Sequence, residues 1–246
     1  MSLQKRVGLA RALSKIGYCS RSQAGVLIRA GRVTLNGRIV RDPETPSRIP
    51  QDRIQIDGSS LAKAIPVYLV MNKPRGIVTT AADEQGRKTV YDLLEPGIPW
   101  VGPVGRLDKA SEGLLLLTND SEWAAKITDP ARHLDKKYHV QIDCIADADL
   151  LAKITRDSPE PLRAKTARLL RHGDKHSWLE IILDEGKNRQ IRRLLEAQNI
   201  RVLRLVRVSI GPLDLGDLKK AESRSLTPEE KRSIDHALQE ETMGMR

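Results

Sequence analysis

Aromatic side chains are the scarcest class in this sequence, which has no phenylalanine, three tryptophans and four tyrosines among 246 residues. Hydrophobic residues still make up 39% of the chain, so a core can form, but its side chains must be largely aliphatic. RNA-binding domains that stack bases on rows of exposed aromatics are therefore not expected. The length suits one large domain or two unequal ones.

Cysteine, metal-ligand patterns and long apolar runs are also lacking. The two cysteines, Cys19 and Cys144, lie far apart, which argues against a disulfide framework and fits a reducing compartment. No His, Cys or carboxylate set recurs at metal-ligand spacing, and no glycine-rich nucleotide loop is found. No apolar run approaches the roughly 18 residues of a membrane span, and the basic N-terminus has no apolar signal core. We therefore expect a soluble, cytoplasmic protein without metal, nucleotide cofactor or membrane partner.

Acidic residues are absent before Asp42, and this makes the charge one-ended. Residues 1–60 hold 11 Lys or Arg and four acids, so they carry +7 of the formal net charge of +10. Such an excess is expected of a segment that binds a phosphate backbone. The simpler alternative is a solvated basic surface.

The first sixty residues predict two short helices followed by a small sheet. An apolar face at helical spacing precedes a capping box formed by Ser20 and Gln23, which starts the second helix. Asn36-Gly37 predicts a hairpin, and residues 52–58 a further strand. These elements and the residues that mark them resemble the S4 RNA-binding domain, which implies contacts to the shape and phosphates of structured RNA. The candidate RNA contacts flank the second helix: Arg21, Arg29 and Arg32.

The rest of the chain predicts a second, larger domain. Residues 61–66 form a polar linker, residues 67–226 the main body, and residues 227–246 a C-terminal helix and tail. Strands and helices mix in the body without strict alternation, so the expected fold class is α+β with a mixed, largely antiparallel sheet. Residues 143–178 show little pattern apart from residues 147–156, which predict an amphipathic helix.

The most informative stretch is residues 105–120, GRLDKASEGLLLLTND. A four-leucine run, short enough to be a buried strand, lies between a glycine turn and a helix-start signal. Asp108 is thus held in a loop six residues ahead of a rigid strand. A carboxylate placed beside the core in this way is either a paired structural ion or a catalytic group.

A helix predicted after Gly186 carries several cations. At about 100° per residue, Arg193 faces solvent and Arg192 lies on the margin of the core face, which is formed by Ile191, Leu194 and Leu195. Arg192 is thus the natural ion-pair partner for Asp108. Two other cations are better placed for phosphate: Lys187 and Arg189. The alternative is that all of these cations are solvated surface charges.

Two further residues stand out in the body. Tyr138 alternates with apolar residues of a predicted strand, so its ring faces the core, where it can line a pocket or simply pack. Lys73, followed by Pro74, is assigned a structural or phosphate-binding part rather than a catalytic one.

Five motifs follow one another along the body: Asn72-Lys73-Pro74, residues 105–120, Lys137-Tyr138, residues 186–193 (GKNRQIRR) and Ile210-Gly211-Pro212-Leu213. In this order they resemble the RsuA/RluB/RluE/RluF family of ribosomal RNA pseudouridine synthases. They cover nearly all of residues 67–226, and the S4-like segment in front matches the arrangement of most members. Ser111 stands where many members have threonine, a change that retains the hydroxyl.

The resemblance implies an enzyme that isomerises a uridine of ribosomal RNA to pseudouridine without metal or cofactor. Asp108 would initiate cleavage of the glycosidic bond, and Tyr138 would stack on the base and serve in proton transfer at C5. Arg192 would pair with Asp108 and keep it ionised, and Arg106 would contact RNA beside the flipped nucleotide. The expected partner is structured ribosomal RNA, with a lean towards the large subunit, and the expected state is a monomer.

Two other functions remain open on the sequence. Asp108 and Glu112 can be read as the carboxylate pair of a glycosidic hydrolase, because the distance between carboxyls in a loop is unconstrained. Against this, nothing around Glu112 would raise its pKa. A non-catalytic S4-type RNA-binding or ribosome-assembly factor would explain the basic N-terminal segment equally well, but it has no use for a carboxylate beside Arg106.

Overall fold

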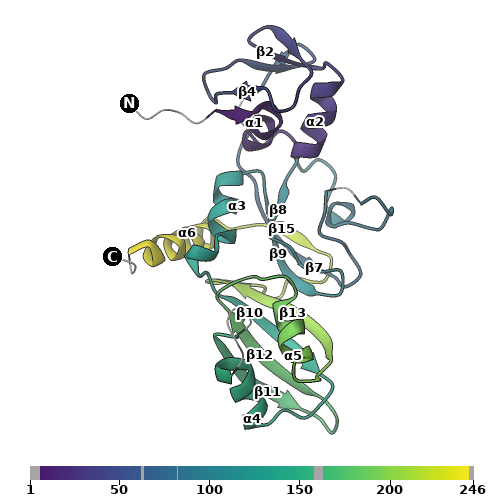
Figure 1. Cartoon of the computed structure of the whole chain (residues 1–246), viewed down its shortest axis with the longest axis vertical. Coiled ribbons are helices and arrows are strands. Elements are labelled where there is room, and N and C mark those ends of the chain that lie inside the picture. The colour runs from purple at the N-terminus through teal and green to yellow at the C-terminus, as the bar shows by residue number, and fades with distance from the viewer. Residues whose placement is uncertain (1–5, 62–63, 82, 158–162, 244–246) are drawn as a thin grey trace. The chain divides into compact units, whose positions relative to one another are not determined.

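The computed structural model describes residues 6–61, 64–81, 83–157 and 163–243, with side chains to Gln239 (Figure 1). The chain divides into two compact units. The first holds Met1–Tyr68, Glu95–Gly102 and Leu117–Ala124, and the second Leu69–Leu94, Pro103–Leu116 and Ala125–Arg246. The expected linker 61–66 includes residues 62–63, and the expected tail includes residues 244–246, which lie outside the described residues.

The N-terminal segment contains two helices and a small sheet, as the sequence predicts. The helices are α1 (Leu9–Lys15) and α2 (Arg21–Arg29), and the predicted capping box between Ser20 and Gln23 is present. The four-stranded sheet runs in the order β3-β2-β5-β6, with β2 (Val33–Leu35), β3 (Arg38–Val40), β5 (Ile54–Ile56) and β6 (Ser59–Ser60). A separate two-stranded sheet joins β1 (Val7–Gly8) and β4 (Pro46–Ser47).

A nine-stranded sheet forms the centre of the main body. Its path is β11-β12-β10-β13-β9-β7-β15, with β14 added beside β13 and β8 beside β9. Strand β13 runs parallel to β9 but antiparallel to β10, which makes the sheet mixed and largely antiparallel. The strands are β7 (Tyr68–Lys73), β8 (Gly102–Val104), β9 (Glu112–Thr118), β10 (Lys136–Ile142), β11 (Thr166–His172), β12 (Ser177–Leu183), β13 (Val202–Ile210), β14 (Leu213–Asp214) and β15 (Ser223–Ser225). The expected α+β class is confirmed.

Helices and short helical turns accompany the strands outside the N-terminal segment. They are α3 (Ser121–Thr128), α4 (Ala148–Ala152), which continues as the π-helix η3 (Lys153–Asp157), α5 (Gln190–Glu196) and α6 (Pro228–Met243), with short 3₁₀ turns η1 (Val90–Leu93) and η2 (Pro130–Arg132). The sequence Thr227-Pro228-Glu229-Glu230 predicts a capping box at the start of α6. It is present, because Glu230 N–H donates to the Thr227 hydroxyl and Thr227 N–H donates to the Glu230 carboxylate. Among the described residues, no helix is both long and apolar enough to cross a membrane.

The burial of side chains alternates along β10 and shows which face of the sheet is covered. Tyr138, Val140 and Ile142 are buried, and they share one hydrophobic cluster with residues of α4 and α5. Lys137, His139 and Gln141 alternate with them and are only partly buried. One face of this part of the sheet is therefore core, and the opposite face is polar.

The structure differs from the predictions in two places. The sequence of residues 76–80 (GIVTT) predicts a second extended segment, but these residues contribute only an isolated bridge between Val78 and Thr89. Within residues 143–178, the strand β11 was not predicted, and residues 158–162 of this range lie outside the described residues. Strand β11 lies at the edge of the sheet with mostly exposed side chains, so it lacks the apolar alternation by which strands are recognised.

Candidate active site

Strand β9 positions the loop that carries Asp108. All seven residues of the strand are buried, and the four predicted strand leucines lie at its centre. Its second residue, Gly113, has φ +101°, and a Cβ at this position would lie 2.2 Å from the Arg207 carbonyl oxygen of β13. Only glycine allows β9 and β13 to approach this closely. The close approach of β9 and β13 at Gly113 therefore fixes where the Asp108 loop ends.

Hydrogen bonds to main-chain carbonyls hold the front of this loop. The Thr79 hydroxyl donates to the Leu107 carbonyl over 2.8 Å, and Gly76 N–H donates to the Lys109 carbonyl over 2.7 Å. Within the loop, Ser111 N–H donates to the Asp108 carbonyl over 2.9 Å. The irregular segment before η1 thus holds the catalytic candidate in place.

Lys73 lies beneath the loop and is fully buried, with an exposed fraction of 0%. Its Nζ donates to the carbonyls of Ser111 (2.9 Å), Asp108 (3.2 Å) and Pro74 (3.2 Å). Burial lowers the pKa of Lys73 to about 8, although Asp108 and Glu112 act in the opposite direction. The sequence predicts a structural or phosphate-binding part for Lys73, and here its ammonium is enclosed and bonded to main chain. The structural part of that expectation fits the contacts.

Two buried arginines extend this set of cations. Arg192 of α5 is 9% exposed, and its Nη2 donates to the Ala110 carbonyl over 3.1 Å. Arg207 of β13 is 6% exposed, and its Nε donates to the Leu114 carbonyl over 2.8 Å. Neither guanidinium has all of its nitrogens hydrogen-bonded, because Arg192 Nε and Arg207 Nη2 are buried without a hydrogen-bond partner among the described residues. Together with Lys73, they form what we call the cationic cradle of the Asp108 loop.

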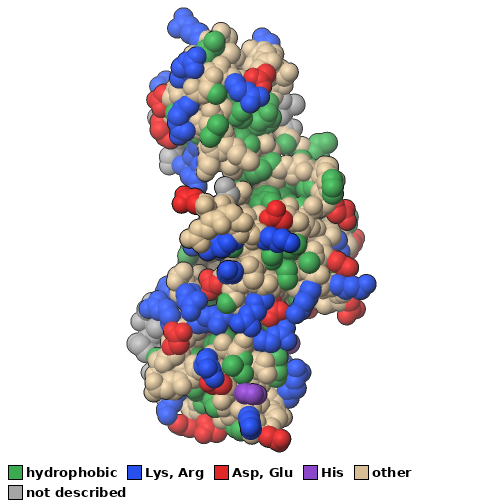
Figure 2. Space-filling view, turned by 90° about the vertical axis from the view of Figure 1, so that its right-hand side faces the viewer, with side chains coloured by type: hydrophobic (Ala, Val, Ile, Leu, Met, Phe, Trp, Pro, Cys, Tyr) green, Lys and Arg blue, Asp and Glu red, His purple; other side chains and the backbone are tan. Residues whose placement is uncertain are grey.

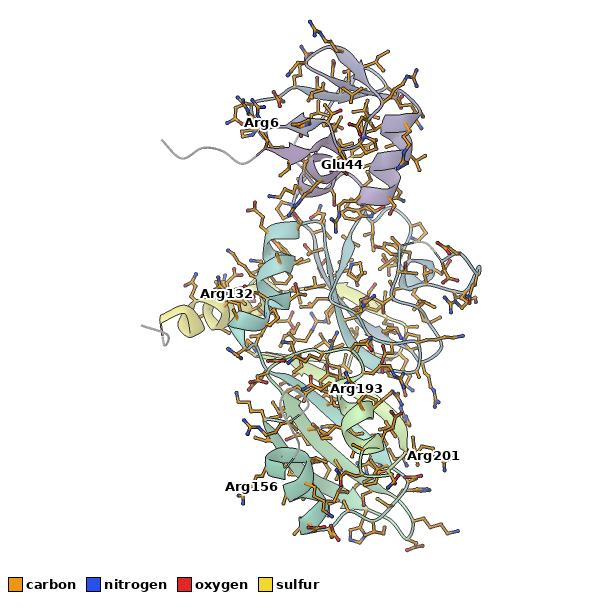
Figure 3. All side chains as sticks on the ribbon, viewed as in Figure 1. Arg6, Glu44, Arg132, Arg156, Arg193 and Arg201 are labelled. Carbon is orange, nitrogen blue, oxygen red and sulfur yellow. The ribbon has the colours of Figure 1, made fainter. Side chains whose placement is uncertain are left out.

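The ion pair of Asp108 differs from the prediction. The closest cation is Arg189, whose Nη1 lies 4.0 Å from Oδ2 of Asp108, and no such contact joins Arg192 to this carboxylate within the described part of the chain. Arg189 precedes α5 in a left-handed conformation (φ +50°), which brings its side chain back over the loop. The predicted helix faces are nevertheless confirmed: Arg192 is buried, and Arg193, labelled on α5 in Figure 3, is exposed. Burial, and then the repulsion of Arg189, lowers the pKa of Arg192.

A pocket of about 600 Å³ opens beside Asp108. Tyr138, 8% exposed, lies in its wall on the core face of β10. Asp108 has 36% of its side chain exposed, so its carboxylate is within reach of a bound molecule. Other lining residues come from the Asp108 loop, the segment before α5 and strand β13: Arg106, Leu107, Ser111, Lys187, Arg189, Leu205 and Arg207. The volume is in the range of pockets that take a small ligand or a single nucleotide-sized group.

The carboxylate of Glu112 is not part of this pocket. It is 4% exposed and accepts hydrogen bonds from Arg204, with Lys220 Nζ 2.8 Å away. Burial alone would raise the pKa of Glu112, but the hydrogen bonds from Arg204 and Lys220 outweigh it and lower the pKa. Glu112 is therefore a structural ion, and the hydrolase pair of Asp108 with Glu112 does not form.

The remaining RNA-binding candidates lie at the surface. Arg106 is exposed at the pocket, and Lys187 pairs with Glu185. Arg21 and Arg29 are exposed on α2. Arg32 is engaged in a fork-like ion pair with Asp57, with Nε 3.0 Å from Oδ1, so part of its charge is already compensated.

Positive charge gathers over the unit that holds the pocket. In the face shown in Figure 2, Lys and Arg side chains form a band across the lower half of the view, where Figure 1 places β10–β13 and α5. Three charged residues of the pocket were not singled out from the sequence: Lys136, Glu185 and Arg207. For Arg207 a signal existed, because it alternates with Leu205 and Ser209 on the buried side of its strand.

Two family models match the chain. The model described as RNA pseudouridylate synthase matches residues 67–197, and the model of the S4 domain matches residues 7–57. The first match includes the Asp108 loop, Tyr138 and α5, and the second includes α1, α2 and the strands up to β5.

Individual proteins are similar over nearly the whole chain. Ribosomal large subunit pseudouridine synthase B of Bacillus subtilis (strain 168) is 35% identical over 229 residues, which cover 90% of this chain and 93% of that protein. An uncharacterized RNA pseudouridine synthase of Rickettsia bellii (strain RML369-C) is 38% identical over 223 residues, 89% of this chain and 96% of that protein. A crystal structure of a pseudouridylate synthase matches with TM-score 0.62 and 29% identity, covering 93% of this chain and 99% of the other.

Proposed function

This chain belongs to the RNA pseudouridylate synthase family and carries an S4 domain, and from that premise we propose that it isomerises one uridine of ribosomal RNA to pseudouridine. The large-subunit RNA is the proposed substrate, because a relative similar along nearly its whole length is named for that subunit. The site assignment rests on the position of Asp108, whose partly exposed carboxylate lies in the pocket wall. Lys73, Arg192 and Thr79 hold the backbone of its loop by hydrogen bonds.

In the proposed reaction, the N1–C1′ bond of uridine breaks, the uracil turns within the pocket, and a C5–C1′ bond forms. The hydrogen at C5 is lost as a proton and N1 gains one, so no atom is gained or lost overall. Asp108 starts the cleavage. Its loop is preorganised, since Lys73 and Arg192 bond to the carbonyls of Asp108 and Ala110 before any substrate binds. Arg189 Nη1, 4.0 Å from Oδ2, is the cation nearest to this carboxylate.

Tyr138 and the cations around the pocket take the remaining parts. The Tyr138 ring lies in the pocket wall, where it stacks on the base and its hydroxyl serves in proton transfer at C5. Arg106 and Lys187, at the pocket, bind RNA phosphates beside the nucleotide that must leave its stack. Arg192 acts as a positioning residue through the backbone of the loop.

The S4 domain supplies affinity rather than chemistry. Arg21 and Arg29 present positive charge on α2, and such contacts to phosphate position an RNA without reading its sequence. Arg32 contributes less, because Asp57 already binds it. We place the protein in the cytoplasm, where ribosomal RNA is handled, and propose that it acts as a monomer on structured RNA.

The test is to map pseudouridine across ribosomal RNA from cells that lack this protein and are rescued with variants. Wild type and Asp174→Asn, which changes an exposed turn carboxylate, should restore the same single site. Asp108→Asn should lower the rate of formation by on the order of 10² to 10⁴ or more, while RNA affinity stays equal or rises slightly. If every site persists in the deletion, or Asp108→Asn restores the site fully, the proposed function is wrong.

A further inference from the structure

The polar face of the sheet, opposite the pocket, carries a group of side chains that the proposed reaction does not use. We call it the outer face and define it by Lys137, His139, Arg168, Arg171, Trp178, Glu180, Arg204 and Lys220, with Glu112 at its base. The strand residues of this set alternate with the buried residues that line the pocket side, so the two surfaces lie on opposite sides of β10, β12 and β13.

Charge on the outer face is layered. The two carboxylates lie deep, with 11% of the Glu180 side chain and 4% of the Glu112 side chain exposed. The cations that cover them are open to solvent: 67% of Arg168, 62% of Lys220 and 38% of Arg204 are exposed. An approaching molecule therefore meets cations first and the acids only beneath them.

The layer is not neutral as a whole. The outer face has five Lys or Arg side chains and two carboxylates. Lys137 and Arg171 have no ion-pair partner among the described residues, so their charge is not compensated. His139 does not add to this charge at neutral pH, since burial lowers its pKa despite the neighbouring Glu180. A surplus of positive charge on an open sheet face attracts a polyanion.

An aromatic ring lies within this layer. The guanidinium of Arg171 is 5.2 Å from the Trp178 ring centroid, and that of Arg204 is 5.5 Å from it. The three side chains come from three strands, β11, β12 and β13, and so cross the sheet in one row. Guanidinium groups bind phosphate through paired donors, and an indole ring stacks on a nucleobase. Phosphate and base together are what a nucleic acid strand offers, whereas an acidic peptide offers only the anion.

We propose that the outer face is a second RNA-binding surface, which holds a strand of the substrate RNA away from the modified uridine. Its phosphates lie on Arg168, Arg171 and Arg204, and a base lies against Trp178. The inference extends the proposed function and rests on it only for the class of partner. The physical advantage is added affinity from a contact that leaves the pocket free.

Trp178 itself reports on this surface. The full chain with Trp100→Phe and Trp123→Phe retains Trp178 as its one tryptophan, since the sequence contains three. Titration with a single-stranded oligouridylate of about a dozen nucleotides at low salt should quench its fluorescence. Arg171→Gln in this background should weaken the quenching and reduce the slope of log affinity against log salt by about 0.7, the share of one phosphate contact. The matched control is Arg232→Gln on α6, an exposed arginine away from the face, which should leave the slope unchanged.

Three results of the titrations would overturn the proposal. One is RNA binding, seen by anisotropy, without a change at Trp178; another is quenching that Arg171→Gln leaves unaltered. The third is equal quenching by an oligoglutamate of matched charge, which would assign the face to an acidic protein instead. If the tryptophan variants do not fold, hydrogen–deuterium exchange on the unmodified chain tests the same surface. RNA should protect residues 166–182 from exchange, and absence of protection counts against the proposal. Because pseudouridine formation is measured separately, loss of the reaction with intact quenching would reject the proposed function alone.

Discussion

The Arg192 side chain contacts the main chain of the Asp108 loop, because its Nη2 donates to the Ala110 carbonyl over 3.1 Å. The Asp108 carboxylate, in contrast, has Arg189 as its nearest cation. The arginine on the buried margin of α5 therefore holds the backbone of the loop, and the arginine ahead of the helix supplies the positive charge nearest to the carboxylate. Positioning and charge compensation, which the sequence assigned to one residue, are divided between two.

Arg192→Ala should lower kcat far more than Arg193→Ala. Loss of a buried, charged donor leaves the Ala110 carbonyl unsatisfied, and such hydrogen bonds are worth about 1.5–3 kcal/mol, or roughly a 10- to 100-fold drop in kcat. Arg193 is exposed, so its removal should change kcat less than about twofold. Single-turnover formation of pseudouridine measures both, and Arg192→Lys should recover part of the rate. Equal losses in the two alanine variants would contradict the assignment.

Lys73 should make stability depend on alkaline pH. In the folded protein its pKa is about 8, against 10.5 for an unperturbed lysine. Between these values the unfolded chain binds more protons, so this group adds stability as pH rises from about 8 to about 10.5, by on the order of 3 kcal/mol at most. Urea unfolding of wild type and Lys73→Met across this range checks it: the free-energy difference between them should shift in favour of wild type. A constant difference would show that the lysine is not perturbed.

Gly113→Ala should disrupt the sheet where β9 meets β13. The added Cβ would lie 2.2 Å from the Arg207 carbonyl oxygen in a backbone with φ +101°, so steric overlap and backbone strain act together. We expect a loss of at least several kcal/mol in unfolding free energy, measured by thermal or urea unfolding. Gly173→Ala is the matched control, because nothing lies within 4 Å of its Cβ position. A similarly small effect of both changes would be inconsistent with the close approach.

Tyr138→Phe separates the ring from its hydroxyl. The ring should still fill the pocket wall, so KM should change little, whereas kcat should fall by on the order of 10² to 10⁴ if the hydroxyl transfers a proton. The readout is the split between kcat and KM on an RNA stem-loop that contains the target uridine. Full activity would reduce Tyr138 to a packing residue.

The fold was predictable where a local signal was strong. Capping boxes at Ser20 and Thr227 and the apolar alternation of β10 each depend on a few neighbouring residues, and each is present. Strand β11 was missed because an exposed edge strand has little apolar periodicity to reveal it. Its charged side chains read as a loop.

The site was predictable in its residues but not in its pairings. The helix-face reasoning placed Arg192 against the core correctly, yet the ion pair of Asp108 depends on the left-handed turn at Arg189, which no periodicity encodes. Glu112 remained a rival carboxylate until its tertiary partners, Arg204 and Lys220, were known. Both partners are distant in sequence, and spacing alone carries no information on such contacts.

The cationic cradle has a consequence for sequence divergence. Its donors bind carbonyl oxygens, which every amino acid supplies, so the path of the loop does not depend on which side chains it bears at positions 109 and 110. Substitutions there would alter the surface that an RNA touches while the carboxylate stays in place. New targets can thus be acquired by changing the loop's side chains, whereas a change in Lys73, Arg192 or Arg207 would disturb the chemistry for every target at once.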